Sequence, residues 1–208
     1  MKNGNPTVFV IDDDDAVRSS LRLLFKSYGL DTVLHASADD FLASYDRARA
    51  GCVVLDVRMP GMSGLELQQR LNALGATIPI VFITGHGDVP MAVEAMQAGA
   101  YDFLQKPFRD DDLLARVQRA LARDAELRTL LRARHDTRDR LATLTPRERD
   151  VLDLVVVGKA NKVIAADLGL SQRTVEIHRA RVMEKMDAAS LAQLVRMVLD
   201  LERPEGPG

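Results

Sequence analysis

The chain has 208 residues, of which 47% are apolar and 28% charged, and its formal net charge is −2. These values are ordinary for a globular chain that buries a core, and the length suits one large domain or two small ones. No apolar run approaches the roughly 18 residues of a membrane span, and the N-terminus enters a strand pattern at once, unlike a signal peptide. The single cysteine, Cys52, excludes an intrachain disulfide and lies in an apolar run, as a buried thiol does in a reducing compartment. We therefore expect a cytoplasmic protein.

Strand and helix patterns alternate over the first 123 residues. The first helix pattern, 15–29, carries Val17, Leu21, Leu24 and Tyr28 at helical spacing and closes at Gly29. Five such strand–helix units predict an α/β fold of the flavodoxin-like type, a doubly wound five-stranded parallel sheet covered by helices. The predicted strands are 7–12, 31–35, 52–57, 78–85 and 101–106, and the helices are 15–29, 37–45, 64–74, 91–99 and a segment starting at 111.

The last of these helical patterns continues unusually far. Leu114, Val117 and Leu121 form one apolar stripe, and six of the nine residues 132–140 are charged. We interpret this segment as one long helix that leaves the first domain and becomes a solvated linker. The alternative is a helix that ends near Arg123, followed by a flexible chain.

A second domain begins at TPRERDVL. Thr145 as N-cap, Pro146 at the first helical position and Glu148 three residues after the cap form a full capping box. Helical patterns at 146–157, 162–168, 172–186 and 190–201 predict a small all-α domain of four helices, and the tail RPEGPG is expected to be disordered. The predicted organisation is therefore a first domain at 1–123, a linker helix at 124–143 and a helical domain at 144–208.

Polar side chains stand at the carboxyl ends of four predicted strands. These ends meet at one edge of a doubly wound sheet, where ligands bind. Several carboxylates in one cleft repel each other and need a cation, and Mg²⁺ suits hard oxygen ligands. Lysine and threonine donors suit an added phosphoryl group. The residues are Asp12 and Asp13 after the first strand, Asp56 at the end of the third, Thr84 on the fourth and Lys106 after the fifth.

Asp56 ends a strand whose preceding positions are all apolar. A carboxylate held beside Mg²⁺ can attack phosphorus and become an acyl phosphate, which explains a charge at this position. The following loop needs Pro60, Gly61 and Gly64 to turn sharply and keep the site open. An isolated aspartate at a strand end is more often a cap or an ion-pair partner, so the prediction rests on the whole set.

The segments VIDDD, VVLDVRMPGMSG, ITG and LQKPF resemble the receiver domain of two-component response regulators, and ITGHGDVPMAVEAMQAGAYDFLQKPF is most similar to the FixJ-like branch. The resemblance implies that Asp56 is the phosphoacceptor for a histidine kinase and that Thr84 and Lys106 contact the phosphoryl oxygens. It implies that Phe103 is the aromatic switch residue, with Tyr101 as a competing candidate that fits the family spacing less well; either aromatic side chain can also simply belong to the core. The implied magnesium ligands are Asp13, Asp56, Asp12 through water, and the backbone carbonyl of Arg58.

Two neighbours of the site are expected to act on the phosphoryl group. Arg58 and His86 lie two residues beyond Asp56 and Thr84, so we expect both side chains to overhang the phosphoryl group and to tune its hydrolysis. A role of His86 as metal ligand or catalytic base is a lesser alternative, because no other His or Cys accompanies it.

The segment 161–186 has the rhythm of a helix–turn–helix, with inward Ile164, a turn at Gly169 and a cap at Ser171. Together with TPRERDVL it resembles the LuxR-type domains of the NarL/FixJ group, which place the second helix in the major groove of DNA. On this second helix Val175, His178 and Val182 are assigned to the core. The opposite face presents Arg173, Thr174, Glu176, Ile177, Ala180 and Arg181, and Lys162 and Arg179 are expected to add affinity for phosphate.

The charge of this domain leaves a second interpretation open. Residues 141–208 hold ten basic and ten acidic side chains, although 159–185 hold six basic and three acidic ones. A helical protein-docking domain therefore remains an alternative to DNA binding. Glu176 replaces a lysine of relatives and favours a cytosine amino group over a phosphate. We expect Glu176 and Ile177 to set the sequence preference.

The resemblance predicts a response regulator that controls transcription, with a histidine kinase, promoter DNA and RNA polymerase as partners and no membrane. We expect the protein not to be an enzyme in the usual sense, although its receiver takes part in phosphotransfer and slow self-hydrolysis. We expect phosphorylation to produce a homodimer through residues 91–105; release of inhibition within one chain is the alternative. A magnesium-dependent phosphohydrolase needs a second aspartate where this chain has Arg58, and a flavodoxin-like cofactor binder would suffer repulsion between the carboxylates and a flavin phosphate.

Overall fold

The computed structural model describes residues 5–85 and 89–202. The chain divides into two compact units, Met1–Leu127 and Arg128–Gly208. The division expected from sequence, with a linker at 124–143, stays a prediction. The tail 203–208, expected to be disordered, lies outside the described residues. In the part of the chain that is described, no helix has the length and apolar character needed to cross a membrane.

The first unit contains a five-stranded sheet in which every strand pair is parallel. Its strands are β1 (Thr7–Ile11), β2 (Asp31–His35), β3 (Gly51–Asp56), β4 (Ile80–Thr84) and β5 (Asp102–Gln105). The spatial order is β2-β1-β3-β4-β5, so the chain reverses its direction of travel between β1 and β3. This is the doubly wound, flavodoxin-like arrangement that the alternating patterns predicted, with its switch point between β1 and β3.

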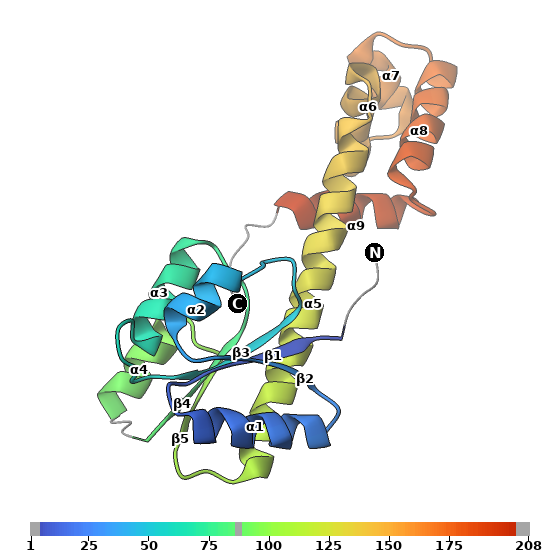
Figure 1. The fold of residues 1–208 in the computed structure, drawn as a ribbon. Helices are drawn as coiled ribbons and strands as arrows, with labels where there is room; N and C mark the ends of the chain where they lie inside the picture. Colours follow the sequence, from blue (N-terminus) through green and yellow to red (C-terminus); the bar gives the residue numbers. More distant parts are fainter. Residues whose placement is uncertain (1–4, 86–88, 203–208) are drawn as a thin grey trace. The chain divides into compact units, whose positions relative to one another are not determined.

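Helices cover both faces of this sheet (Figure 1). The first-unit helices are α1 (Asp15–Ser27), α2 (Ala38–Ser44), α3 (Gly64–Ala73), α4 (Val89–Gln97) and the first part of α5 (Asp110–Ala142). Side chains of α2, α3 and α4 pack on one face, against Phe9, Leu55 and Phe82. Those of α1 and α5 pack on the other, against Val8 and Val54. Both faces of β1 and β3 are buried, as their continuous apolar runs indicated.

One detail of α1 differs from the sequence prediction. The helix ends at Ser27, and Tyr28 is its C-cap with half of its surface exposed, so Tyr28 does not continue the buried stripe. Phe25 is fully buried instead. Residues three and four apart share a face of a helix, and the tertiary contacts selected Phe25 rather than Tyr28.

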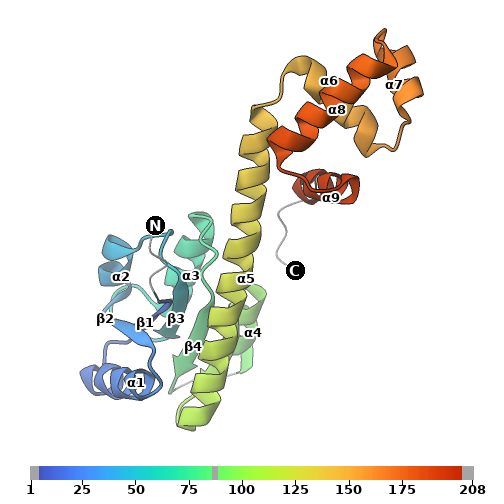
Figure 2. The ribbon, with the colours of Figure 1, turned by 90° about the vertical axis from the view of Figure 1, so that its right-hand side faces the viewer.

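Helix α5 is continuous from Asp110 to Ala142 (Figure 2). The charged segment 132–140 is therefore helical, and the alternative of a helix ending near Arg123 is wrong. Within the first unit, the buried carboxylate of Asp124 on α5 accepts a hydrogen bond from Gly51 N at 2.9 Å.

Up to residue 202, where the description of the second unit ends, four helices follow α5: α6 (Pro146–Val156), α7 (Asn161–Leu168), α8 (Gln172–Met186) and α9 (Leu191–Glu202). The predicted capping box at Thr145 is present, with Glu148 N donating to Thr145 Oγ1 and Thr145 N donating to Glu148 Oε2. Gly169 ends α7 in the left-handed conformation. Val151, Leu152, Ile164, Val175 and Met186 form the centre of the core.

Candidate functional site

Two carboxylates lie side by side at the switch point of the sheet. Asp56 is the last residue of β3, and Asp12 directly follows β1, whose Ile11 pairs with Leu55 of β3. Asp12 is 1% exposed and Asp56 is 7% exposed. The parallel pairing of β1 and β3 therefore places both carboxylates at one end of the sheet, as the strand ends predicted.

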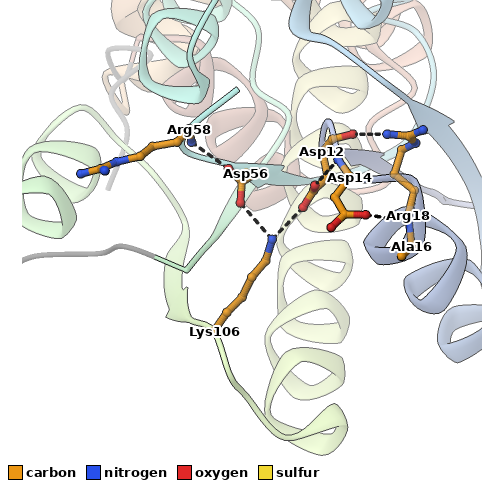
Figure 3. Close-up of polar contacts among 7 residues, drawn as sticks. All are labelled: Asp12, Asp14, Ala16, Arg18, Asp56, Arg58 and Lys106. Carbon is orange, nitrogen blue, oxygen red and sulfur yellow. Dashed lines mark hydrogen bonds and ion pairs between the residues drawn. The ribbon is translucent and has the colours of Figure 1, made fainter. Parts of the chain in front are cut away.

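Lys106, after β5, lies between these carboxylates (Figure 3). Its Nζ is 2.7 Å from Asp12 Oδ2 and 2.9 Å from Asp56 Oδ1. An ammonium group shared by two buried carboxylates offsets their mutual repulsion. The three residues stand at or directly after the ends of three different strands, and the peptide bond between Lys106 and Pro107 is cis.

Burial and pairing act in opposite directions on these charges. Burial raises the pKa of Asp56, and the hydrogen bond and charge of Lys106, together with the backbone N–H of Arg58, only partly offset this increase. Burial lowers the pKa of Lys106, but its hydrogen bonds to Asp12 and Asp56 outweigh that effect and leave the pKa raised. Lys106 is therefore charged at neutral pH, and the carboxyl group of Asp56 lies in a partly desolvated setting.

Backbone donors orient the two carboxylates, and one side chain holds the backbone of Asp12. Arg58 N donates to Asp56 Oδ2 at 2.7 Å, and Asp14 N donates to Asp12 Oδ1 at 2.9 Å. Arg18 on α1 donates to the Asp12 carbonyl at 2.6 Å (Figure 3). The sequence interpretation did not include Asp14 or Arg18. The run DDDD at 12–15 followed by an arginine three residues later was the available signal.

The loop after Asp56 leaves room for the site in two different ways. Gly61 has a φ of 77°, which favours glycine, so it supplies the expected turn. Gly64 begins α3, and a Cβ at this position would collide with the carbonyl oxygen of Asp56. The reason for Gly64 is thus close approach of the backbone rather than a turn.

The donor set fits a magnesium ion in part. Asp12 and Asp56 supply two adjacent carboxylates, and Mg²⁺ binds through one or two carboxylates and keeps several waters. Among residues 5–85 and 89–202, no group of three His, Cys, Asp or Glu side chains is arranged to hold a metal. Asp13 is exposed, so the expected convergence of three carboxylates is not observed, and the role of Asp13 stays a prediction.

The remaining predicted residues of this site differ in position. Thr84 is buried at the end of β4. Phe103 is partly buried, with its ring centroid 6.3 Å from that of Phe82, whereas Tyr101 packs in the cluster on the opposite face of the sheet. The Arg58 side chain is exposed and extends away from Asp56 (Figure 3), so the expected overhang is not observed. His86 lies outside the described residues.

The second unit presents a mixed polar face on α8. Val175 and Val182 are buried in the core and His178 is partly buried, as predicted. Ser171 caps the helix, its Oγ accepting from Thr174 N at 3.1 Å. The exposed residues of the predicted DNA-contacting set are Lys162, Arg173, Glu176, Ile177, Ala180 and Arg181.

Two members of that set are partly engaged within the protein. Thr174 is partly buried, and its hydroxyl lies 2.8 Å from Ser171 Oγ. Arg179 is also partly buried and donates to Asn161 Oδ1 on α7 at 2.8 Å. Arg179 therefore connects the two helices of the motif, and its phosphate contact stays a prediction.

Comparison with protein families decides the identity of the chain. The model of the response regulator receiver domain matches residues 8–118, and the model of bacterial regulatory proteins of the luxR family matches residues 142–198. The chain is a two-component response regulator. It combines a receiver with a LuxR-type helix–turn–helix domain and acts as a transcription factor.

Individual relatives place this response regulator in the FixJ group, as the sequence interpretation predicted. It is 56% identical to the transcriptional regulatory protein FixJ of Azorhizobium caulinodans over 92% of this chain and 91% of that one. It is 50% identical to nodulation protein W of Bradyrhizobium diazoefficiens over 91% of this chain and 84% of that one.

Solved structures support the same assignment. The response regulator StyR matches with a TM-score of 0.86 and 46% identity over 94% of this chain and 99% of that one. Full-length FixJ from B. japonicum matches with a TM-score of 0.58 and 44% identity over 95% and 97% of the two chains. Receiver domains as a family bind Mg²⁺ at the phosphorylation site, and the two domains imply a histidine kinase and DNA as partners.

Proposed function

We propose that Asp56 of this response regulator is the residue that accepts a phosphoryl group from a histidine kinase. The observation that carries this proposal is the position of Asp56, a carboxylate at the end of β3 that is bonded to Lys106 at 2.9 Å and sits beside Asp12. A desolvated carboxylate with a raised pKa is a better nucleophile than one in water.

The transfer forms one bond and breaks one. An oxygen of Asp56 bonds to phosphorus as the P–N bond of the phosphohistidine breaks, and the imidazole leaves with the electron pair of that bond. Lys106 contacts Asp56 before transfer, and we expect its ammonium group to bind a phosphoryl oxygen afterwards. Thr84 is the second expected hydrogen-bond donor to the phosphoryl group. In slow self-hydrolysis, water attacks phosphorus, the P–O bond to Asp56 breaks, and inorganic phosphate leaves while the Asp56 carboxylate is regenerated; Arg58 and His86 are proposed to tune this step.

Magnesium is the proposed cofactor. Asp12, Asp13, Asp56 and the carbonyl of Arg58 would hold it, and when bound the ion supplies charge stabilisation for phosphoryl transfer. The chain itself contributes the orientation of these oxygens, because the N–H groups of Asp14 and Arg58 fix the rotamers of both buried carboxylates.

The phosphoryl group is proposed to act through Thr84 and Phe103. It adds about two negative charges beside Lys106, which would draw the Thr84 hydroxyl inward. Phe103 then moves further into the space beside Phe82, and the surface at residues 91–105 changes. Helix α4 exposes Val89, Val93 and Met96, spaced as one stripe of a helix. This apolar stripe supports a homodimer of phosphorylated chains.

The second unit is proposed to bind promoter DNA through α8. Arg173, Glu176, Ile177 and Arg181 are all exposed. We expect the two arginines to contact phosphates, and Glu176 and Ile177 to contact base edges. Two copies in one dimer add their contacts through a high effective concentration, and the bound dimer is expected to recruit RNA polymerase. The exposed basic and short side chains of α8 favour this over the protein-docking alternative.

Phosphotransfer from purified histidine kinases tests whether the chain accepts a phosphoryl group. Light scattering with and without beryllofluoride then tests dimerisation, and DNA binding under the same two conditions tests activation. We expect a monomer without the phosphoryl mimic, and a dimer with higher DNA affinity in its presence. A monomer in both states that still gains affinity would contradict dimerisation and leave release of inhibition. In that case a chain lacking residues 1–123 should bind as well as the activated protein.

A further inference from the structure

The last turn of α5 is bonded to the C-terminus of α8. Arg140 Nη1 donates to the carbonyl oxygen of Met186 at 2.9 Å, and its Nη2 lies 3.0 Å from Asp187 Oδ2. All three residues belong to the second unit. The guanidinium group of Arg140 therefore joins the end of α5 to the end of α8, the helix that we propose to contact the DNA bases.

The bonded position is a well-defined helix terminus. Asp187 adopts the left-handed conformation with a φ of 52°, and the N–H groups of Asp187 and Ala188 bond back to Glu184 and Met183. The terminal carbonyl groups of a helix carry partial negative charge. The planar fork of an arginine can bond a carbonyl and a carboxylate simultaneously, which an ammonium group cannot do in the same way.

A second connection holds the same helix end. Lys185 Nζ donates to the carbonyl of Thr143 at 3.0 Å and to Glu148 Oε2 at 2.6 Å. Glu148 is 2% exposed and also accepts from Thr145 N, so it belongs to the start of α6. The ends of α5 and α8 and the start of α6 thus form one polar network within the second unit.

We propose that Arg140 is a positioning residue that holds α8 in a fixed orientation to the end of α5, and so sets the spacing of DNA half-sites that a dimer accepts. The inference rests on the proposed function, dimeric binding to DNA. Arg140 contacts α8 five to thirteen residues beyond the proposed DNA contacts at 173–181, about 8–20 Å along the helix axis. It therefore acts on the orientation of α8 and not as a contact to the bases.

The spacing of half-sites is the readout that a merely structural role would not change. The full-length protein with beryllofluoride is titrated with duplexes in which an in vitro selected site has its half-sites moved apart by 1 to 5 base pairs. Wild type should lose at least about tenfold in affinity when the half-sites move by half a helical turn. For Arg140→Ala we expect a loss below about threefold, together with half-site affinity within about twofold of wild type, since a loosened connection tolerates more spacings.

One control and two further test variants accompany Arg140→Ala. Arg138→Ala removes the same charge from an exposed position on α5 and should keep the wild-type spacing profile. Arg140→Lys should resemble Arg140→Ala, because a point charge does not replace the fork. Asp187→Asn removes the negative charge of one partner and leaves a weaker, neutral acceptor. Asparagine tolerates the left-handed backbone, so this variant should fold and show an intermediate profile. The methyl NMR signals of Met183 and Met186 report whether each variant retains its fold.

The possible results separate the two hypotheses. A wild-type profile in both Arg140→Ala and Asp187→Asn would overturn the role of Arg140. If Arg140→Ala unfolds, the Asp187→Asn profile decides in its place. A wild-type protein that is dimeric by light scattering but binds with no dependence on spacing would overturn the inference alone. A wild-type protein that stays monomeric with beryllofluoride would contradict dimeric binding, the proposed function, and the inference with it.

Discussion

Lys106 Nζ lies 2.9 Å from Asp56 Oδ1, although 50 residues separate them in the chain. In the proposed transfer, this ammonium group would exchange its bond to Asp56 for a bond to a phosphoryl oxygen. The proposed reaction would therefore move the contact of Lys106 from the carboxylate of Asp56 to the added phosphoryl group.

The substitution Asp56→Asn should abolish phosphorylation while the fold survives. Phosphorylation is lost because an amide is not a usable nucleophile. The fold survives for a separate reason. Burial raises the pKa of Asp56, so the folded receiver holds the proton of this group more tightly than the unfolded chain does. The stability that this contributes is present at low pH and lost as the pH rises through the folded pKa. At pH 7 without metal the amide should therefore melt at or above the wild-type temperature. Acetyl phosphate labelling followed by mass spectrometry measures the first effect and calorimetry the second.

Asp31→Asn, at an exposed position at the start of β2, is the matched control and should label like wild type. Stable labelling of Asp56→Asn would mean that another carboxylate is the acceptor.

Removal of magnesium should stop labelling of the wild-type protein. The buried pair Asp12 and Asp56 is neutralised only in part by one ammonium group, and a divalent cation supplies the remaining charge. Asp12→Asn should weaken magnesium binding at least about tenfold by losing one charged ligand of the site. Titration of Mg²⁺ against the methyl signals of Met59 and Met62, in the loop after Asp56, gives the affinity directly. Equal affinities of the two proteins would exclude Asp12 from the site.

Glu176→Ala should relax the base preference at one position of the DNA site, whereas Lys162→Ala should weaken all sites alike. Both side chains are exposed on the helix–turn–helix. Loss of one phosphate contact lowers the slope of log affinity against log salt by about 0.9, and loss of a base contact leaves that slope unchanged. Selection from a random DNA library and salt titrations measure the two effects. An unchanged preferred sequence for Glu176→Ala would mean that α8 enters the groove in another orientation.

A charge on the exposed stripe of α4 should prevent dimerisation. Val93 and Met96 are each nearly half exposed, so Val93→Asp and Met96→Asp should fold normally, but their charges would have to be desolvated in a dimer interface. Light scattering with beryllofluoride should give a monomer for both. Leu23→Asp, an equally drastic change at an exposed site on α1, should still dimerise. Dimers of the α4 variants would place the interface elsewhere.

The stability of the second unit should depend on pH through Glu148. The hydrogen bond from Lys185 and the backbone N–H of Thr145 lower the pKa of Glu148 to about 2 from an ordinary value of 4.5. Because the folded pKa is depressed, its contribution is present above about pH 4.5 and is lost as the pH falls through 2. Urea unfolding, followed by the methyl NMR signal of Met186 at a series of pH values, should show a lower free energy of unfolding of the wild-type protein as the pH falls.

Glu148→Gln should lack that pH dependence and be less stable at pH 7 by about 1–3 kcal/mol, because Lys185 loses a charged partner. Glu184→Gln, an exposed carboxylate on α8, is the control and should follow wild type. Identical pH profiles for wild type and Glu148→Gln would show that the pair does not contribute.

Local sequence determined the elements and the outline of the site. Alternating apolar runs and helical stripes predicted the five strand–helix units, and the box at Thr145 and the glycine at 169 predicted the ends of helices, since these signals act over three or four residues. Parallel strands end at one edge of a sheet, so Asp12, Asp56 and Lys106 could be placed together from their positions alone.

Only the tertiary structure decided which side chains meet. Whether Phe25 or Tyr28 is buried, and whether Asp13 joins Asp12 and Asp56, depends on distances of a few ångströms that no periodicity encodes. The bond from Arg140 to Met186 joins residues 46 positions apart, and the sequence shows them only as a charged linker and a helix end. Hydrogen bonds require both partners within about 3 Å. That condition is met by packing of the helices against one another, and the local pattern of residues does not contain it.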